Sequence, residues 1–424
     1  MILRRRMAGF RELTPLDLAL ERLRASLSHR ITETEVVSLE SSLGRILAED
    51  VKARISVPEF DRSAVDGYAV LAEDTYGATP HNPIVLKVVA TIEPGASPLE
   101  LPTIRRGEAA KIMTGAPLPR GANAVVMAEY AKQTDDRVEI TRQVAELQNV
   151  SRRGEDYAEG EIIARRGTMI RPWHIAAIAE QNITTVKVLR RPRAALITTG
   201  TELAPLGIEK MPGKIIDTNR PMLKALLEEA GAEVIDLGNA PDSIDEIREG
   251  IRMGLSTSDL VIITGGTSLG ESDLVPEAIN TLGEPGVIVH GLRIRPAKPT
   301  GIGIIDGKPI FMLSGFPVSS YIGFKILVKP CIMLMTGVKE MPPPIVRGKL
   351  TRRIAKPAGI RAYVRVKVIR TGETIMVEPL MLTGSGLLST LTKGNGILEV
   401  PEMLEGYDEG EIVEVELTQP LEET

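Results

Sequence analysis

A glycine-rich loop after an apolar run is the segment best suited to chemistry. Residues 260–263 read Leu-Val-Ile-Ile, which predicts a buried strand, and residues 264–273 follow with TGGTSLGESD. Glycine lets the backbone approach a ligand closely and adopt positive φ. The N–H groups of such a loop, and of a helix that follows it, bind oxyanions. The expected contacts to a phosphate or similar group are Gly265, Gly266, Thr267 and Ser268. Simple loop capping is the alternative for the two hydroxyls.

Five carboxylates in five separate loops could bind a cation or a ligand. They are Asp66, Asp156, Glu202, Asp242 and Asp273. Cleavage of a phosphoanhydride-like bond needs a cation that neutralises developing charge and a group that orients water. Glu202 and Asp273 follow two strands expected in one sheet, so topology should bring them together. The alternatives are helix capping for these two, a helix start for Asp242, and a local Asx-turn for Asp66.

Basic side chains gather at residues 293–299, which read RIRPAKP. Arg293, Arg295 and Lys298 lie around two prolines that stiffen the loop. A tetrahedral dianion needs such fixed positive charge and N–H donors. A solvated basic face is the alternative. Residues 313–319 lead into an apolar helix that ends near residue 335, and its N-terminus is a second candidate anion site, with Ser319 as a donor.

Length and composition bound the class of protein. The chain has 424 residues, which favours two to four domains. Its 43% hydrophobic and 25% charged residues are typical of a soluble globular protein. A net charge of −5 and 3% aromatic residues argue against nucleic acid and anionic membranes as partners. We find no run of membrane-spanning length and no secretion signal, so we expect a cytoplasmic protein.

The few histidines and the single cysteine argue against a zinc site. His29, His81, His174 and His290 show no ligand spacing, and Cys331 lies in an apolar run typical of a core. A metal ion here should therefore be hard and carboxylate-bound, such as Mg²⁺.

Residues 188–337 alternate between strand and helix patterns. We expect strands at 194–199, 233–237 and 260–263, a helix at 221–230 that ends at Gly231, and a second helix opened by a capping box of Ser243 and Glu246. This alternation predicts a doubly wound parallel sheet, whose ligands bind at the carboxyl ends of the strands.

The flanking segments predict a multidomain α/β chain. Thr14 and Pro15 should begin a helix over residues 14–28, and 172–180 should form another. The predicted domains are a discontinuous, elongated N-terminal linker domain (10–50 and 151–187), an inserted mostly-β domain (51–150), the α/β domain (188–337) and a C-terminal β-barrel domain (342–424). The last follows a stiff proline linker and contains a hairpin that turns at Thr371 and Gly372.

Seven motifs in order resemble one family over nearly the whole chain. They are residues 58–69 (PEFDRSAVDGYA), 112–117 (IMTGAP), 153–156 (RGED), 199–203 (TGTEL), 265–273, 295–299 (RPAKP) and 315–319 (GFPVS). The chain resembles the molybdopterin molybdenumtransferases, the MoeA family, which is related to the E domain of gephyrin. The α/β domain resembles the MogA-like molybdopterin-binding fold.

The resemblance implies molybdenum cofactor biosynthesis. Adenylylated molybdopterin would bind, its adenylate would be hydrolysed with help from Mg²⁺, and molybdate or tungstate would be inserted with release of AMP. The metal-binding residues would be Asp242, Asp273 and Glu202. The family also implies a homodimer in which Asp66 and Asp156 complete the active site from the partner subunit, and the molybdopterin adenylyltransferase is a candidate partner.

The resemblance implies functional roles for three further residues. Arg361 and Ser385 match positions near the family's cofactor, and Thr114 is a signature position with a ligand or interface contact. An ordinary turn is the alternative at Ser385 and at Thr114. Relatives usually carry Lys at position 295, Pro at 314 and Asn at 316, where this chain has Arg, Ser and Phe. Arg295 keeps the charge but changes the hydrogen-bond geometry, so the oxyanion preference could differ. Phe316 lacks the amide donor of Asn, so Ser319 or the backbone would have to make the contact there.

Three alternative functions share this fold. The molybdopterin adenylyltransferase usually consists of the α/β domain alone, and the β domains with the Asp66 motif favour the later, metal-inserting step. A nucleotide-cleaving relative would have other flanking motifs. A gephyrin-like scaffold would not need carboxylates in five loops.

Overall fold

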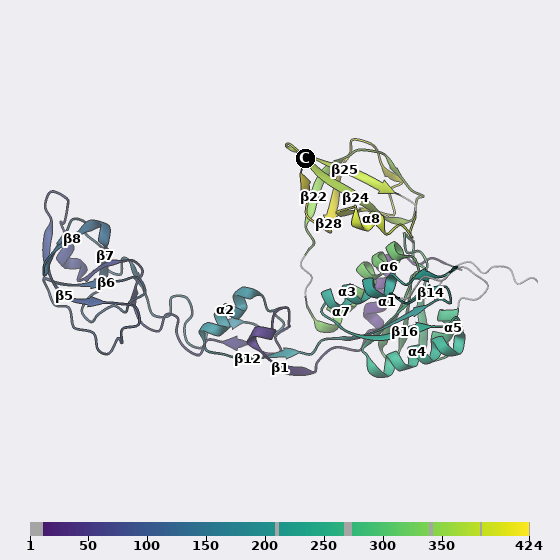
Figure 1. Cartoon of the computed structure of the whole chain (residues 1–424), viewed down its shortest axis with the longest axis horizontal. Coiled ribbons are helices and arrows are strands. Elements are labelled where there is room, and N and C mark those ends of the chain that lie inside the picture. The colour runs from purple at the N-terminus through teal and green to yellow at the C-terminus, as the bar shows by residue number, and fades with distance from the viewer. Residues whose placement is uncertain (1–11, 208–211, 267–273, 339–341, 382–383, 424) are drawn as a thin grey trace, which may run out of the picture. The chain divides into compact units, whose positions relative to one another are not determined.

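The computed structural model describes residues 12–207, 212–266, 274–338, 342–381 and 384–423 (Figure 1). The chain divides into two compact units. Unit 1 comprises residues 1–35, 44–46 and 188–424, and unit 2 comprises 36–43 and 47–187. Strands β1 (Thr34–Ser38) and β12 (Thr185–Leu189) cross from one unit to the other. The finer division into four domains stays a prediction.

Unit 1 contains a six-stranded sheet. In spatial order its strands are β16 (Glu233–Ala240), β13 (Arg193–Thr199), β17 (Leu260–Thr264), β21 (Lys308–Leu313), β20 (Gly301–Ile305) and β18 (Pro285–His290). The first four strands are parallel, as the sequence predicts, whereas β20 runs antiparallel to both of its neighbours. The sheet is therefore mixed at the edge that β20 and β18 form.

Helices cover both faces of this sheet, which confirms the doubly wound prediction. They are α1 (Leu16–Ser26), α3 (Asn219–Glu229), α4 (Ile244–Thr257), α5 (Leu274–Asn280), α6 (Pro317–Gly323) and α7 (Lys329–Thr336). Because side chains alternate along a strand, Leu196 of β13 packs in one core with α1, α3 and α7. Its neighbour Ile197 packs in the opposite core with α4 and α5 (Figure 1).

Two helix starts differ from the prediction. Helix α1 begins at Leu16, and Thr14 does not cap it. The Thr14 N–H donates to the Gly291 carbonyl oxygen at 3.0 Å, so Thr14 forms a strand-like bridge instead. Ser243 is the N-cap of α4, but its side chain makes no capping hydrogen bond, so the predicted capping box is wrong. The hydrophobic stripe of α4, centred on Ile247 and Ile251, is confirmed.

Residues 317–336 form one continuous helical stretch, in which the π-helical segment Phe324–Val328 joins α6 to α7. By length and composition this stretch could cross a membrane, contrary to the expectation from the sequence. Two-thirds of it is buried against the sheet and its neighbours. Cys331 lies fully buried there, and burial raises the pKa of its thiol to about 12. The stretch is thus packed as a core helix.

The C-terminal part of unit 1 is a closed five-stranded barrel, as predicted. Its strands are β22 (Ile345–Leu350), β24 (Arg361–Thr371), β25 (Thr374–Met381), β26 (Gly396–Val400) and β28 (Ile412–Leu417). Pairing of β24 with β26 closes the ring, and Thr371 opposite Thr374 confirms the predicted hairpin. Strand β19 (Ile294–Arg295) of the preceding segment pairs with the start of β24. Smaller elements of unit 1 are α8 (Ser389–Thr392), β14 (Leu203–Ala204), β15 (Ile215–Ile216), β23 (Ile354–Ala355), β27 (Gly406–Tyr407) and β29 (Glu422–Glu423).

Unit 2 contains a second six-stranded sheet, which confirms the mostly-β character of this region. In spatial order its strands are β7 (Ala124–Met127), β4 (Gly67–Val70), β6 (Glu108–Ile112), β5 (Ile84–Ile92), β9 (Arg137–Ile140) and β8 (Ala131–Thr134). The remaining elements are α2 (Pro172–Glu180), the single-turn helices Leu39–Ser41, Ala72–Thr75 and Ala128–Tyr130, and the paired short strands β2 (Val51–Lys52) with β11 (Ile162–Ala164) and β3 (Arg62–Ser63) with β10 (Val150–Ser151).

Candidate active site

Three loops meet at the carboxyl ends of β13, β17 and β21. Thr264, the last residue of β17, lies opposite Thr198 on one side and Leu313 on the other. Gly265 donates its N–H to the Leu313 carbonyl oxygen at 3.2 Å and has a φ of +98°. A Cβ atom at Gly265 would lie 2.3 Å from the Thr199 carbonyl oxygen. Only glycine can therefore connect β17 to this loop, as the sequence predicts for Gly265 and Gly266. Thr267, Ser268 and Asp273 lie outside the described residues.

Asn219, which the sequence analysis missed, fastens two of these loops together. Its side-chain amide donates to Thr264 Oγ1 at 3.1 Å and to the Gly315 carbonyl oxygen at 2.8 Å. Thr264 in turn donates to the Ser314 carbonyl oxygen at 2.9 Å. Asn219 is buried at the first turn of α3. Its polar side chain at the start of an otherwise amphipathic helix was the available signal.

Glu202, in the loop beyond β13, and Asp242, in the loop beyond the neighbouring strand β16, lie beside each other. The Thr201 N–H donates to Asp242 Oδ2 at 3.0 Å, so Asp242 sits beside residue 202. A Cβ atom at Gly200 would lie 2.7 Å from Glu202 Oε2, which places the Glu202 carboxylate over Gly200. Both carboxylates are exposed to solvent. The buried Thr199 hydroxyl has no hydrogen-bond partner at this edge among the described residues. The structure therefore brings two of the predicted carboxylates and an orphan hydroxyl together.

Asp66 and Thr114 meet in unit 2. Asp66 Oδ1 accepts hydrogen bonds from the Thr114 backbone N–H at 2.7 Å and from the Thr114 hydroxyl at 2.8 Å. The backbone hydrogen bond, followed by the hydroxyl bond, lowers the pKa of Asp66. These contacts join loops 48 residues apart, so the local Asx-turn is not what holds this side chain. The second oxygen of this exposed carboxylate makes no hydrogen bond within the described part of the chain, so a ligand could use it.

Asp156 lies beside the same signature segment of unit 2. Its backbone N–H donates to the Val57 carbonyl oxygen at 3.0 Å, and the Gly154 N–H donates to the Pro58 carbonyl oxygen at 2.9 Å. Strand β10 pairs with β3 just before these residues. The Asp156 side chain is exposed. The start of one motif, residues 58–69, is thus in contact with the distant motif of residues 153–156.

Arg361 forms ion pairs with three acidic side chains. Its guanidinium donates to Glu402 at 2.8 Å and pairs with Asp17 at 3.1 Å and Glu399 at 3.5 Å. Burial lowers the pKa of Arg361, but the Glu402 hydrogen bond and the surrounding negative charge outweigh burial and raise it overall. This arrangement fits a structural ion-pair hub better than the predicted cofactor contact.

Arg365, four residues further along β24, has the opposite surroundings and was missed by the sequence analysis. It is only 2% exposed, and it donates to Thr390 Oγ1 at 3.2 Å and to the Tyr363 carbonyl oxygen at 3.3 Å. Within the described residues it has no carboxylate partner. Burial, and then the positive charge of Arg295, lower its pKa. Arg365 is therefore a buried cation that is exposed to the positive charge of Arg295 and pairs with no described carboxylate. The alternation of β24 offered no signal, because Val364 and Val366 take the positions inside the barrel and Arg365 lies on the outer face with Tyr363.

Residues 295–298 are shaped by Ser319. The Ala297 N–H donates to the Ser319 hydroxyl oxygen at 3.2 Å, and Ala297 has a φ of +76°. Ser319 is buried, so its hydroxyl positions this basic loop. Arg295 and Lys298 are exposed at the loop surface. The Ser385 carbonyl oxygen accepts a hydrogen bond from Val318 at 3.0 Å, which brings the barrel loop to the start of α6.

No group of three or more His, Cys, Asp or Glu side chains suited to a metal ion occurs among the residues that the structure describes. Mg²⁺, however, is commonly held by one or two carboxylates together with substrate phosphates. Glu202 and Asp242 fit that pattern, and Asp273, the third predicted ligand, lies outside the described ranges.

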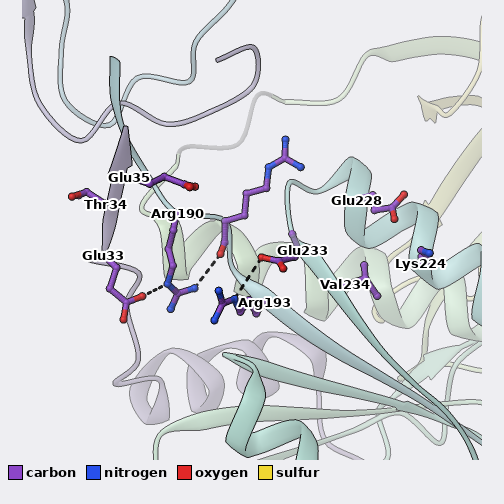
Figure 2. A pocket seen from close by; sticks show the side chains of 11 residues that line it. Glu33, Thr34, Glu35, Arg190, Arg193, Lys224, Glu228, Glu233 and Val234 are labelled. Atoms are coloured by element: carbon purple, nitrogen blue, oxygen red, sulfur yellow. Dashed lines mark hydrogen bonds and ion pairs between the residues drawn. The ribbon is translucent and has the colours of Figure 1, made fainter. Parts of the chain in front are cut away.

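A cavity of about 720 Å³ lies at the opposite end of the strands (Figure 2). Its walls include Arg193 and Glu233, the first residues of β13 and β16, and Arg190 and Glu33. Figure 2 shows Arg190 directed toward Glu33 and Arg193 toward Glu233. Since β13 spans seven residues at about 3.3 Å each, this cavity is separate from the loops beyond Thr199.

Comparisons with known proteins agree with this architecture. Residues 14–181 match the family model "MoeA N-terminal region (domain I and II)", residues 195–333 match "Probable molybdopterin binding domain", and residues 347–418 match "MoeA C-terminal region (domain IV)".

Several relatives align over nearly their whole length. A protein of Methanocaldococcus jannaschii named for molybdopterin biosynthesis is 40% identical, covering 97% of this chain and 100% of the relative. A molybdopterin molybdenumtransferase of Staphylococcus epidermidis is 34% identical, covering 96% of each chain. A crystal structure of the molybdopterin biosynthesis MoeA protein of Pyrococcus horikoshii is 34% identical, with a TM-score of 0.82, covering 96% of this chain and 100% of that one.

The fold and these matches define a multidomain protein built around a molybdopterin-binding type of α/β domain. Within that class, the chain belongs to the MoeA family, the family of the molybdopterin molybdenumtransferases.

Proposed function

We propose that this chain inserts molybdate into adenylylated molybdopterin as a molybdopterin molybdenumtransferase. Water cleaves the adenylate bond, AMP leaves, and the dithiolene of the pterin takes up the metal. Family membership supports the overall reaction. The adenylate step, Mg²⁺ and the choice of oxyanion are our proposals for this chain.

The pair of Arg365 and Arg295 is the observation that carries the proposal. A buried guanidinium is costly unless an anion compensates its charge, and no described carboxylate pairs with Arg365. A tetrahedral dianion such as molybdate would supply that compensation and accept hydrogen bonds from both guanidinium groups. Ser385, on the loop that reaches α6, would contribute a further donor.

The loops beyond β13 and β17 would hold the phosphate end of the substrate. Gly265 and Gly266 allow backbone N–H groups to approach the phosphates. Glu202 and Asp242 would hold Mg²⁺, which when bound supplies positive charge for the leaving phosphate. One of these carboxylates would also orient the attacking water, and Asn219 keeps the neighbouring loops in register.

Asp66, Thr114 and Asp156 would act from unit 2 of a partner subunit. Asp66 is hydrogen-bonded to Thr114, and Asp156 is hydrogen-bonded to the chain at Val57, just before the segment that carries Asp66, which supports a shared role. We therefore propose a homodimer with two composite sites, and the molybdopterin adenylyltransferase as a transient partner that delivers substrate in the cytoplasm.

AMP release from adenylylated molybdopterin tests this function. The assay contains Mg²⁺ and either molybdate, tungstate or sulfate, and AMP and metal-loaded pterin are quantified together. Release of AMP with metal-loaded pterin supports the proposal, and the more effective oxyanion identifies molybdenum or tungsten as the metal. Substrate binding without AMP release under all three anions would support a scaffold, and consumption of ATP would support an adenylyltransferase.

Two arginine variants make the assay specific. Arg365→Met removes a charge-assisted contact, which contributes about 1.5–3 kcal/mol, so the KM for molybdate should rise about 10- to 100-fold. Arg361→Met, four residues away on the same strand, should leave that KM within about twofold and mainly lower stability. Equal effects on KM in both variants would contradict the assignment of the oxyanion to Arg365.

Mixed dimers test the composite site. A subunit carrying Asp66→Ala is combined with one carrying Glu202→Ala, and the mixed dimer is purified through two tags. If each site uses unit 1 of one subunit and unit 2 of the other, one of the two sites is intact and activity returns. A mixed dimer as inactive as either parent would show that both residues act within one chain.

A further inference from the structure

Phe316 is an exposed aromatic side chain just beyond the carboxyl end of β21, at the end of the sheet that carries the candidate site. It is the N-cap of α6 and directly follows Gly315, which packs against Gly265. Its side chain is 59% exposed, although its neighbours Ser314 and Val318 are buried. The proposed chemistry does not yet use this ring.

The barrel loop holds the Phe316 ring from one side. A Cβ atom at Gly386 would lie 3.3 Å from Phe316 Cδ1 and 3.6 Å from Cε1, so the Gly386 backbone lies against the ring edge. The hydrogen bond from Val318 to the Ser385 carbonyl oxygen fixes this contact. Phe316 is therefore a ring that is held on one side by the barrel loop and still largely exposed.

The same loop connects this ring to the buried cation. Thr390, whose N–H donates to the Leu387 carbonyl oxygen, accepts the hydrogen bond from Arg365. The loop of residues 386–390 thus contacts the Phe316 ring at Gly386 and the Arg365 guanidinium, which no described carboxylate compensates, at Thr390. A ligand that fits both carries an anion at one end and a planar heterocycle nearby.

We propose that Phe316 stacks on the pterin ring of the substrate and makes this chain bind the pterin more tightly than it would with a non-aromatic side chain at this position. The proposal rests on the proposed function. The pterin is the expected heterocycle because the dithiolene that receives the oxyanion is attached to it, whereas the adenine lies beyond the phosphates. Stacking on an aromatic side chain is favourable for any planar heterocycle.

Direct binding measurements test the stacking. Dissociation constants for pterin-6-carboxylate and for AMP are measured by fluorescence titration and calorimetry on the full-length wild type, Phe316→Tyr, Phe316→Leu and Phe316→Asn. We expect the Leu and Asn variants to weaken pterin binding about 5- to 100-fold, with AMP binding unchanged. Phe316→Tyr keeps the ring and should stay within about threefold of the wild type.

Controls separate stacking from general effects. Met403→Asn replaces another apolar side chain, 86% exposed on the barrel, and should change neither dissociation constant. Thermal unfolding of every variant verifies folding. Unchanged pterin binding in Phe316→Leu and Phe316→Asn, or a loss confined to AMP, would overturn the stacking proposal.

The AMP-release assay on the wild type keeps the two proposals distinguishable. A wild type that releases AMP and loads metal, with pterin binding insensitive to position 316, refutes only the role of Phe316. A wild type that neither binds pterin nor releases AMP refutes the proposed function itself.

Discussion

Asp259 anchors the chain where it enters the sheet of unit 1, and its replacement should be costly. Its carboxylate is 6% exposed. It accepts hydrogen bonds from both terminal nitrogens of Arg190 at 2.6 and 2.8 Å, from the Arg193 N–H at 2.7 Å and from His29 Nε2 at 2.7 Å. Burial alone would raise the pKa of Asp259, but these hydrogen bonds outweigh burial and lower it to about 2.

The depressed pKa gives the size of the effect. A fall of about two pKa units, at about 1.36 kcal/mol per unit, means that ionised Asp259 stabilises the fold by about 2.5 kcal/mol. Asparagine resembles the protonated acid, so Asp259→Asn should cost about that much at pH 7. Because the folded-state pKa lies below the unfolded value, the contribution is complete above about pH 5. It should fall to about half near pH 3 as the carboxyl group is protonated.

Cys331 supplies the assay, because it is the single cysteine and lies fully buried in unit 1. Its labelling by a pyridyl disulfide across a urea series gives the free energy of unfolding of unit 1, at pH 7 and at lower pH. Asp236→Asn is the matched control. Asp236 also pairs with an arginine, Arg220, through contacts of 2.8 and 2.9 Å, but the two side chains are 30% and 33% exposed.

The control should lose less than about 1 kcal/mol, since solvent screens an exposed pair. The reasoning is refuted if Asp259→Asn costs no more than Asp236→Asn at pH 7. It is also refuted if the difference between wild type and Asp259→Asn does not shrink as the pH falls from 5 to 3.

Two other predictions concern the core of unit 1. Gly265→Ala should cost about 3 kcal/mol or more in urea unfolding, because the new methyl group would clash with the Thr199 carbonyl oxygen at a φ of +98°. Gly231→Ala, at a φ of +87° with open space around it, should cost only about 1–2 kcal/mol; equal losses would contradict the clash. Native Cys331 should resist iodoacetamide at pH 8, because burial raises its thiol pKa to about 12, and mass spectrometry showing rapid alkylation would contradict its burial.

The sequence alone determined the parts of this protein that depend on local pattern. Apolar runs and helical stripes predicted β13, β17, α3 and α4, because burial of one face or of a whole strand leaves a periodic trace. The ordered motifs identified the family and placed Gly265 and Gly266 beyond a strand. The predicted capping hydrogen bonds of Thr14 and Ser243 do not form. Tertiary contacts and side-chain rotamers decide which capping bonds form, and the sequence pattern does not record them.

Only the tertiary structure decided which arginine is free to meet an anion. Arg361 and Arg365 lie on one strand and have the same intrinsic chemistry, but acidic side chains from α1 and from residues 399–402 surround only the first. Thr390, which holds Arg365, and Gly386, which lies against the Phe316 ring, likewise come from a loop distant in sequence. Charge compensation depends on distances in space, and a linear pattern does not record them.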